Sequence, residues 1–368
     1  MNVLHLLSGG SVGGIEMLCR DIANLSTDRN EFCFLYSGGM IADEIEQKSV
    51  IYRYYLKNIF GRVLMLWNLV RKQKYDIIIV HHEGIGIYSF YLMLCQCFRR
   101  IKFIKYLHCS YDEDFFCTGN KLKDRLNYQI LKKTLRRSNH LIAVSKFVQN
   151  SYQGEFRIDE NKISVIYNGI PQEHICLEMN VINMKENHIR CLFIGRLVEL
   201  KGLHILLQAI KKLQEMGTII ELEVLGDGPL RSEYESWVLK QGIENNIFFR
   251  GYELRKEMYF ASTQIYICPS ICEEAFGISI VEAQAAGLIC VASRVGGIPE
   301  IILGGQDGFL FQKGDVDDLT HTLLEAIEMC KSPQCCDMQK AARQNSARFS
   351  IQQTVGKLHE ICERIIEE

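Results

Sequence analysis

The chain has 368 residues, which is long for one hydrophobic core and fits two domains of ordinary size. Hydrophobic residues make up 48% and charged residues 23%, a composition typical of soluble globular proteins. The net charge of −2 gives the whole molecule no bias toward nucleic acids. The 15 cysteines include no C-x-x-C pair and no Cys/His cluster with zinc spacing, so we expect buried free thiols in a reducing cytosol.

The first half of the chain alternates strand-like and helical segments. The N-terminal run MNVLHLLSGG lacks a basic leader region, so it is typical of a first β-strand and not of a signal peptide. The most apolar stretch, residues 85–98, is too short to span a bilayer and predicts a buried helix. The alternation predicts a parallel sheet covered on both faces. We expect strands at 3–8, 31–37, 75–80, 101–107, 140–144 and 162–167, and helices at 15–25, 59–72, 85–98, 121–137 and from 146 onward.

Two features follow strands of this half. The loop S-G-G-S-V-G-G-I-E after the first strand is neither G-x-G-x-x-G nor a P-loop, and it either turns the chain or admits a phosphate. His108 comes directly after the strand at 101–107. Ligands of open α/β sheets bind beyond the carboxyl ends of strands, so His108 lies where chemistry is expected, although a structural histidine is the alternative.

The segment from Arg99 to Arg137 is strongly basic. Within it, Lys121–Arg137 has the pattern of an amphipathic basic helix. It forms either a solvated outer face or a surface that docks on anionic lipid headgroups.

A polar stretch at 172–188 is the best candidate linker, and the strand–helix alternation restarts after it. The final segment, 355–368, is amphipathic. We expect strands at 189–194, 219–225, 247–250, 265–268, 288–291 and 308–311, with helices between them.

The segment Pro269–Gly287, P-S-I-C-E-E-A-F-G-I-S-I-V-E-A-Q-A-A-G, carries the most specific pattern. A helix is predicted to begin near Phe276-Gly277-Ile278 and to end at Gly287 in a left-handed C-cap. Free N–H groups and the positive end of the helix dipole suit an anionic or hydroxyl-rich ligand. Glu274 lies at the mouth of this site, and Glu282 lies further along the helix.

Cations and glycines follow other strands of the second half. Arg196 and Lys201, after the strand at 189–194, make a diphosphate clamp. Gly226 ends the strand at 219–225 and lets a base or ribose lie close to the backbone. Glu274 and Glu282 can each accept hydroxyl hydrogen bonds. Two unrelated surface carboxylates are the alternative, but the position of all these groups at strand ends of one domain favours a site.

These motifs, G-R-L-V-E-L-K-G, V-L-G-D-G-P-L, E-A-F-G-I-S-I-V-E-A-Q-A-A-G and V-G-G-I-P-E-I-I, resemble the donor-binding half of retaining glycosyltransferases of family 4. The S-V-G-G-I-E loop, the His108 strand end and V-I-Y-N-G-I are similar to the N-terminal half of that family. Its Glu-x7-Glu motif is matched by Glu274 and Glu282, and the resemblance covers nearly the whole chain.

The resemblance implies the GT-B fold, in which two Rossmann-like βαβ domains face each other across a cleft. Residues 1–171 would form the acceptor domain, with a C-terminal helix at about 353–368 packing back on it. Residues 172–188 would be the linker, and residues 189–352 the donor domain for a nucleotide sugar.

The resemblance also assigns roles residue by residue. Arg196 and Lys201 would hold the diphosphate, Glu282 the ribose and Glu274 the transferred sugar. Backbone groups of Phe276, Gly277 and Ile278, and Gly226 in its strand end, would complete the donor site. From the first domain, Gly14 would close on the diphosphate, and His108 would lie near the sugar as a catalytic residue beside Glu274.

The implied reaction moves a hexose-type sugar from a nucleotide-diphosphate sugar, with a UDP-sugar favoured, to a glycan or lipid-linked acceptor with retention of anomeric configuration. No cofactor or metal is implied, because cations and the helix dipole neutralise the leaving diphosphate. Bacterial cell-surface polysaccharide assembly is the expected setting, with a cytoplasmic enzyme at the inner face of the membrane. A nucleotide-dependent dehydrogenase, a non-hydrolysing nucleotide-sugar epimerase and a non-catalytic nucleotide-sugar-binding subunit are the alternatives. The sugar, the nucleotide, the acceptor and the oligomeric state are not specified by the sequence.

Overall fold

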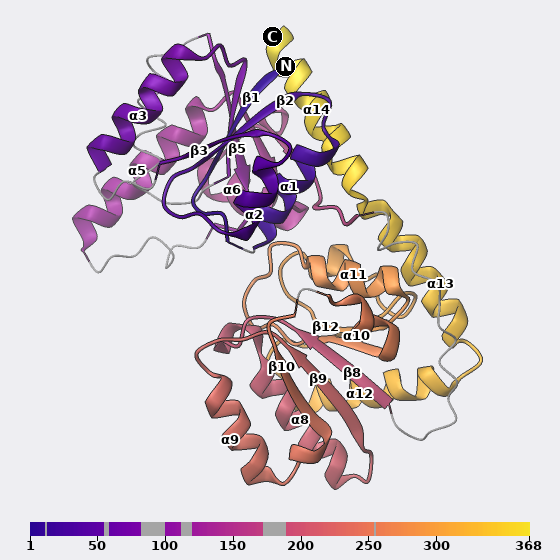
Figure 1. The fold of residues 1–368 in the computed structure, drawn as a ribbon. Coiled ribbons are helices and arrows are strands. Elements are labelled where there is room, and N and C mark those ends of the chain that lie inside the picture. The colour runs from indigo at the N-terminus through magenta and orange to yellow at the C-terminus, as the bar shows by residue number, and fades with distance from the viewer. Residues whose placement is uncertain (12, 55–58, 82–99, 112–119, 172–188, 254) are drawn as a thin grey trace. The chain divides into compact units, whose positions relative to one another are not determined.

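A computed structural model describes residues 1–368 except 12, 55–58, 82–99, 112–119, 172–188 and 254. The predicted helix at 85–98 and the predicted linker at 172–188 therefore lie outside the described residues. The chain divides into two compact units (Figure 1). Unit 1 comprises Met1–Gly169 and Ile351–Glu368, and unit 2 comprises Ile170–Ser350.

The described part of unit 1 contains a sheet of seven parallel strands in the order β3-β2-β1-β4-β5-β6-β7. The chain runs outward from β1 in one direction and then crosses to β4, so β1 and β4 flank a topological switch point. The strands are β1 (Asn2–Leu7), β2 (Arg29–Phe34), β3 (Val50–Arg53), β4 (Ile77–Val80), β5 (Lys102–Leu107), β6 (His140–Ala143) and β7 (Ile163–Val165).

Helices cover both faces of this sheet. Figure 1 shows α1 and α14 on one side and α3 and α5 on the other. Helix α1 buries Leu18, Cys19 and Ile22 at helical spacing, which is the apolar stripe expected of a helix lying on a sheet. The helices are α1 (Gly14–Leu25), α2 (Met40–Glu46), α3 (Ile59–Lys72), α5 (Lys121–Arg137), α6 (Lys146–Phe156) and α14 (Ile351–Glu367).

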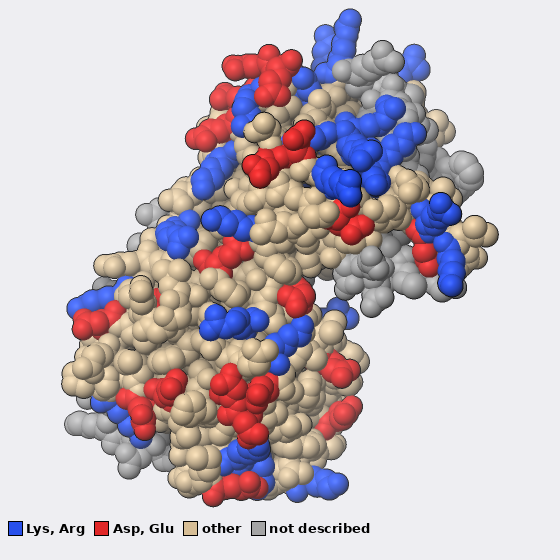
Figure 2. All heavy atoms as spheres, turned by 180° about the vertical axis from the view of Figure 1, so that it is seen from behind, with Lys and Arg blue, Asp and Glu red and all other residues tan. Residues whose placement is uncertain are grey.

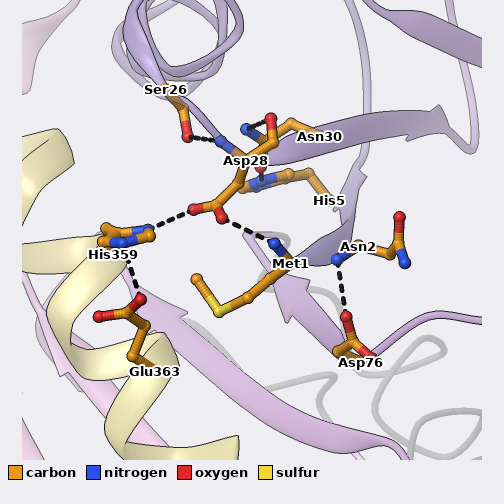
Figure 3. Close-up of polar contacts among 9 residues, drawn as sticks. All are labelled: Met1, Asn2, His5, Ser26, Asp28, Asn30, Asp76, His359 and Glu363. Carbon is orange, nitrogen blue, oxygen red and sulfur yellow. Dashed lines mark hydrogen bonds and ion pairs between the residues drawn. The ribbon is translucent and has the colours of Figure 1, made fainter.

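The C-terminal helix α14 returns to unit 1 and packs next to α1. Its buried face is apolar and includes Val355, Leu358 and Cys362. At its middle, His359 Nδ1 lies 2.7 Å from Asp28 Oδ2, and the amino group of Met1 lies 3.0 Å from Asp28 Oδ1 (Figure 3). Asp28 therefore connects the C-terminal helix to the segment that leads into β2.

The contact between His359 and Asp28 is expected to make the docking of α14 pH-dependent. The hydrogen bond between His359 and Asp28 raises the pKa of His359 above the ordinary value of 6.5. A raised folded-state pKa stabilises the fold below pH 6.5, and this stabilisation is lost as pH rises through the folded pKa. Burial alone raises the pKa of Asp28, but its hydrogen bonds with His359 and the Met1 amino group lower it overall. The Asp28 contribution is therefore lost only in acid.

We expect His359→Gln to lower the melting temperature by about 1–2 °C near pH 6, because a partly exposed ion pair contributes about 1 kcal/mol. The difference should shrink toward about pH 9, where His359 is neutral in both proteins. Thermal unfolding of both proteins, with the same N-terminus, at several pH values checks this. A difference that does not change with pH would contradict it.

The described part of unit 2 contains a six-stranded parallel sheet in the order β10-β9-β8-β11-β12-β13, whose switch point lies between β8 and β11. The strands are β8 (Ile189–Ile194), β9 (Ile220–Leu225), β10 (Ile247–Gly251), β11 (Ile265–Cys268), β12 (Ile289–Ser293) and β13 (Phe309–Phe311). Contacts place α8, α9 and α12 together, and α10, α11 and α13 together. The helices are α8 (Leu203–Glu215), α9 (Arg231–Gln241), α10 (Glu257–Ser262), α11 (Ile278–Ala286), α12 (Val316–Lys331) and α13 (Cys335–Ser346).

Both units thus have the predicted parallel α/β architecture. The described cysteines form no disulfide, and Cys19, Cys33, Cys191 and Cys290 are buried as expected. Cys109 and Cys336 are exposed, so the expectation of buried thiols is wrong for these two. None of the described helices is both long enough and apolar enough to cross a membrane.

Candidate active site

The candidate site of unit 2 lies at the carboxyl ends of β8 and β11, the two strands at the switch point. The loop after β8 carries Arg196 and Lys201, and the loop after β11 carries Ser270 and Glu274. Neighbouring parallel strands end at the same edge of a sheet, so their loops meet there. The fold therefore brings together groups that are distant in sequence, such as Lys201 and Glu274, which are 73 residues apart.

Lys201 and Glu274 form the centre of this edge. Nζ of Lys201 lies 2.5 Å from Oε1 of Glu274, and the Ser270 hydroxyl donates to the same oxygen at 2.6 Å. Both charged side chains are largely buried, with 32% and 17% of their surface exposed. Burial alone would lower the pKa of Lys201, but the charge of Glu274 and its hydrogen bond raise that pKa overall. Lys201 is therefore a cation at neutral pH.

Backbone contacts fix the position of Glu274 and Lys201. Gly202 follows Lys201 in the left-handed conformation (φ +69°), and a Cβ there would lie 1.8 Å from the carbonyl oxygen of Pro269. Gly296 has φ +53°, and a Cβ there would lie 2.1 Å from the carbonyl oxygen of Glu274. The next N–H, of Gly297, donates to that same carbonyl at 2.8 Å. Only glycine permits these close approaches, so both loops hold the ion pair in one place.

Helix α11 begins beside Glu274, as the sequence predicted. Its N-cap is Gly277 and its first residue is Ile278, and no side chain caps its N-terminus. The ring of Phe276 is buried against Phe349, with 5.4 Å between ring centroids. The N–H of Ile280 donates to the carbonyl of Gly277 at 3.0 Å, whereas the N–H groups before it, of Ile278 and Ser279, have no acceptor further back in the helix and are available to a ligand. The helix ends at Gly287 with φ +82°, which confirms the predicted C-cap.

Glu282 lies in the second turn of α11 and is buried, with 8% of its surface exposed. Both of its oxygens contact Nζ of Lys256, at 2.8 and 2.6 Å. Sequence reasoning missed Lys256, and no spacing rule could have found it because the two residues come from separate helical regions. It also missed Ser270 and the contact of Gly296 and Gly297 with Glu274, although the segment V-G-G-I-P-E-I-I that contains both glycines was noted.

Two further predicted donor residues lie on neighbouring loops. Arg196 follows β8, is exposed, and forms no ion pair with any described residue. Gly226 follows β9 in a positive-φ conformation, and its N–H donates to the carbonyl of Gly251 at 2.7 Å.

The two predicted residues of unit 1 lie at the carboxyl edge of its own sheet. Gly14 is exposed and is the first residue of α1, directly after the glycine loop. His108 follows β5 and is buried, and its Nε2 lies 3.0 Å from Nδ1 of His81. His81 follows β4, so the rule on strand ends that selected His108 would also have selected His81.

The fold and the two sheet edges define a protein class. Each unit is a Rossmann-like parallel α/β domain, and solved structures of GT-B glycosyltransferases share this fold. One of these, Anabaena Alr3699/HepE in complex with UDP, matches with a TM-score of 0.85 and 21% identity, covering 99% of this chain and all of the other. A glycosyltransferase from Rickettsia africae matches with a TM-score of 0.81 and 21% identity, covering 100% of this chain and 99% of the other.

Sequence families agree with the fold. Residues 12–174 match the family described as Glycosyltransferase Family 4, and residues 177–345 match Glycosyl transferases group 1. Together the two matches span both units and support a glycosyltransferase of the group 1 and family 4 type. The uncharacterized glycosyltransferase MJ1178 of Methanocaldococcus jannaschii is 27% identical over 325 residues, which cover 86% of this chain and 85% of the relative.

Proposed function

We propose that the chain transfers a hexose-type sugar from a nucleotide-diphosphate sugar, with a UDP-sugar favoured, to a glycan or lipid-linked acceptor, with retention of anomeric configuration. The observation that carries this proposal is the grouping of Lys201, Glu274 and the open N-terminus of α11 at the switch point of unit 2. One cation, one carboxylate and a set of free N–H groups suit a diphosphate joined to a polyhydroxyl ring.

Each described group then has a role. Lys201 and Arg196 bind the diphosphate, together with the first-turn N–H groups of α11 near Gly277 and Ile278. Glu274 accepts hydrogen bonds from hydroxyls of the transferred sugar, and Glu282 accepts them from the ribose. The backbone at Phe276 faces the sugar or phosphate, while its buried ring fixes the loop. Gly226 leaves room for the nucleoside, and Gly14 and His108 contribute from unit 1.

In the proposed reaction the bond between the anomeric carbon and the diphosphate breaks, and a bond to the acceptor oxygen forms on the same face. The acceptor proton passes to the leaving phosphate, so no protein nucleophile is needed. The protein's part is to hold the acceptor and the diphosphate on the same face of the sugar and to stabilise the negative charge that develops on the diphosphate. The cations and the dipole of α11 supply the positive charge that compensates it, so the proposal requires no metal ion.

A donor screen tests the proposal. The purified protein is heated with UDP-, GDP- and ADP-sugars, and one donor class is expected to raise the melting temperature. The stabilising donor, labelled in its sugar, is then incubated with and without lipid-linked acceptors, and the anomeric configuration of the product is determined. Consumption of the donor without any acceptor, giving an isomeric nucleotide sugar, would instead indicate an epimerase. Stabilisation by none of the donors would contradict the proposal.

The acceptor side of the proposal rests on relatives and on one surface of unit 1. A relative named UDP-Gal:alpha-D-GlcNAc-diphosphoundecaprenol alpha-1,3-galactosyltransferase, from Escherichia coli, is 24% identical over 278 residues, covering 72% of this chain and 70% of the relative. A lipid-linked acceptor of that kind would be met at the inner face of the cell membrane.

Helix α5 of unit 1 has the surface that such a membrane contact needs. It buries Leu131 and Leu135, but Leu122 and Leu126 are 82% and 60% exposed among lysines and arginines. Figure 2 shows Lys and Arg side chains gathered on one face of unit 1. A merely solvated helix face does not require two exposed leucines one turn apart, whereas an interfacial helix combines apolar and basic side chains in this way.

We expect the protein to cosediment with anionic vesicles of phosphatidylglycerol, more weakly at high salt. Replacing both Leu122 and Leu126 with serine should weaken binding about 10-fold, because the apolar surface that enters the membrane is lost. Leu239→Ser in unit 2, at a leucine that is 66% exposed, is the matched control and should bind as wild type does. Equal binding to neutral vesicles, or no binding even at low salt, would contradict a basic membrane-docking surface.

A further inference from the structure

Three histidines of unit 1 lie side by side on neighbouring strands. His5 belongs to β1, His81 follows β4 and His108 follows β5, and β4 pairs with both β1 and β5. All three are buried, with 0%, 0% and 9% of their surface exposed. The rings are stacked, with 5.3 Å between the centroids of each neighbouring pair. Only His108 belongs to the proposed site, so the other two have no role in it so far.

The three rings form one chain of hydrogen bonds. Nε2 of His108 lies 3.0 Å from Nδ1 of His81, and Nε2 of His81 lies 3.0 Å from Nδ1 of His5. At the far end, Nε2 of His5 lies 2.9 Å from Oδ1 of Asn30. The Asn30 amide nitrogen donates to the carbonyl of Asp28 at 3.1 Å, which identifies Oδ1 as the acceptor facing His5.

The surroundings keep all three rings neutral. Burial lowers the pKa of His5 to about 4, against smaller upward effects of Asn30 and Asp28. Burial also lowers the pKa of His81 and of His108 well below 6.5, and the buried ammonium of Lys105 lowers both further. A neutral imidazole has one donor nitrogen and one acceptor nitrogen, so one end of the chain sets the direction of every bond.

Asn30 accepts, so Nε2 of His5 carries the hydrogen and its Nδ1 accepts from His81. His81 then donates from Nε2 and accepts at Nδ1, and His108 must donate from Nε2. We propose that Asn30, His5 and His81 are positioning residues that fix His108 as its Nε2–H tautomer, so that Nδ1 of His108 can only accept a hydrogen bond. The donor to Nδ1 of His108 would be a hydroxyl of the transferred sugar. Only this last point rests on the proposed function.

The same cluster invites comparison with a metal site. One ring nitrogen each of His5 and His81 and the Sγ of Cys19 lie within 4.8 Å of one another, and these residues are the one such group among the described residues. Tetrahedral zinc with Zn–N bonds of about 2.0–2.1 Å would separate the two nitrogens by about 3.3 Å. The observed separation is 3.0 Å, and the two rings are stacked with 22° between their planes. This geometry favours a direct hydrogen bond.

Nitrogen-15 NMR of the protein labelled only at histidine reads the tautomer without any substrate. The His108 signals are assigned by their loss in His108→Gln, and His321→Gln in the exposed part of α12 serves as the control that leaves them unchanged. We expect a protonated Nε2 and an unprotonated Nδ1, both invariant between about pH 6 and 8. A protonated Nδ1, titration of His108 in this range, or stoichiometric metal in the purified protein would overturn the proposal.

Variants of His81 separate tautomer control from a packing role. His81→Asn keeps an acceptor, Oδ1, near the position of Nδ1 and should preserve the tautomer and most of the activity. His81→Leu removes the acceptor, and we expect mixed tautomers of His108 and a fall in kcat/KM of about 10-fold, the effect of one lost hydrogen bond. An unchanged tautomer in folded His81→Leu would refute the inference. If the tautomer is as stated but no nucleotide sugar is consumed, the positioning chain is supported and the proposed function alone fails.

Discussion

Lys201→Ala is expected to lower kcat/KM for the nucleotide sugar at least about 100-fold, or about 2.7 kcal/mol of transition-state stabilisation, while leaving the protein folded. The substitution removes the cation proposed to face the diphosphate. It also leaves the Glu274 carboxylate, 17% exposed, without the ammonium that lies 2.5 Å from it. An unpaired negative charge next to a developing negative charge adds to the loss.

Three comparisons sharpen this test. Lys212→Ala removes a lysine of the same unit that pairs with Asp317 on the surface, and it should leave activity near that of wild type. Glu274→Ala is expected to cost at least about 100-fold as well, and the double variant should lose less than the product of the two single effects, because the two residues act on one substrate. Normal turnover of folded Lys201→Ala would refute the site assignment.

Much of the fold follows from the sequence because buried parallel strands are continuous apolar runs. The strand at 189–194 and the helices at 59–72 and 121–137 have the predicted bounds. The elements missed in unit 1, α2 and β3, are short and peripheral. β3 is the edge strand of its sheet and only half-buried, so VIYR gave no distinct signal.

The candidate site was predictable where function depends on local spacing. Glu274, the start of α11 and Gly287 lie within one segment, and their order alone indicates a loop, an open helix start and a C-cap. Contacts between distant segments were not predictable. Lys256 meets Glu282 across 26 residues, and His5 meets His81 across 76, because the sheet order places their strands and helices together.

The contact between Glu282 and Lys256 bears directly on nucleotide recognition. The side chain of Glu282 is 10% exposed, and Nζ of Lys256 contacts both of its oxygens. A lysine in that position holds the carboxylate in one orientation while lone pairs of both oxygens remain for a diol. The proposed ribose contact therefore requires the negative charge of Glu282 and not only its size.

Glu282→Gln is accordingly expected to weaken UDP binding about 10- to 100-fold, the range for one lost charge-assisted hydrogen-bond pair of about 1.5–3 kcal/mol. Titration calorimetry with UDP and with 2′-deoxy-UDP separates ribose recognition from general electrostatics. Wild type should prefer UDP, and the variant should bind the two nucleotides nearly equally. Glu223→Gln removes a carboxylate that is equally paired, with Arg250 at 2.6 and 3.0 Å, and should retain the preference. A Glu282→Gln protein that still prefers UDP over 2′-deoxy-UDP would show that another group binds the ribose, because removing the carboxylate's charge would then have removed no contact to the 2′-hydroxyl.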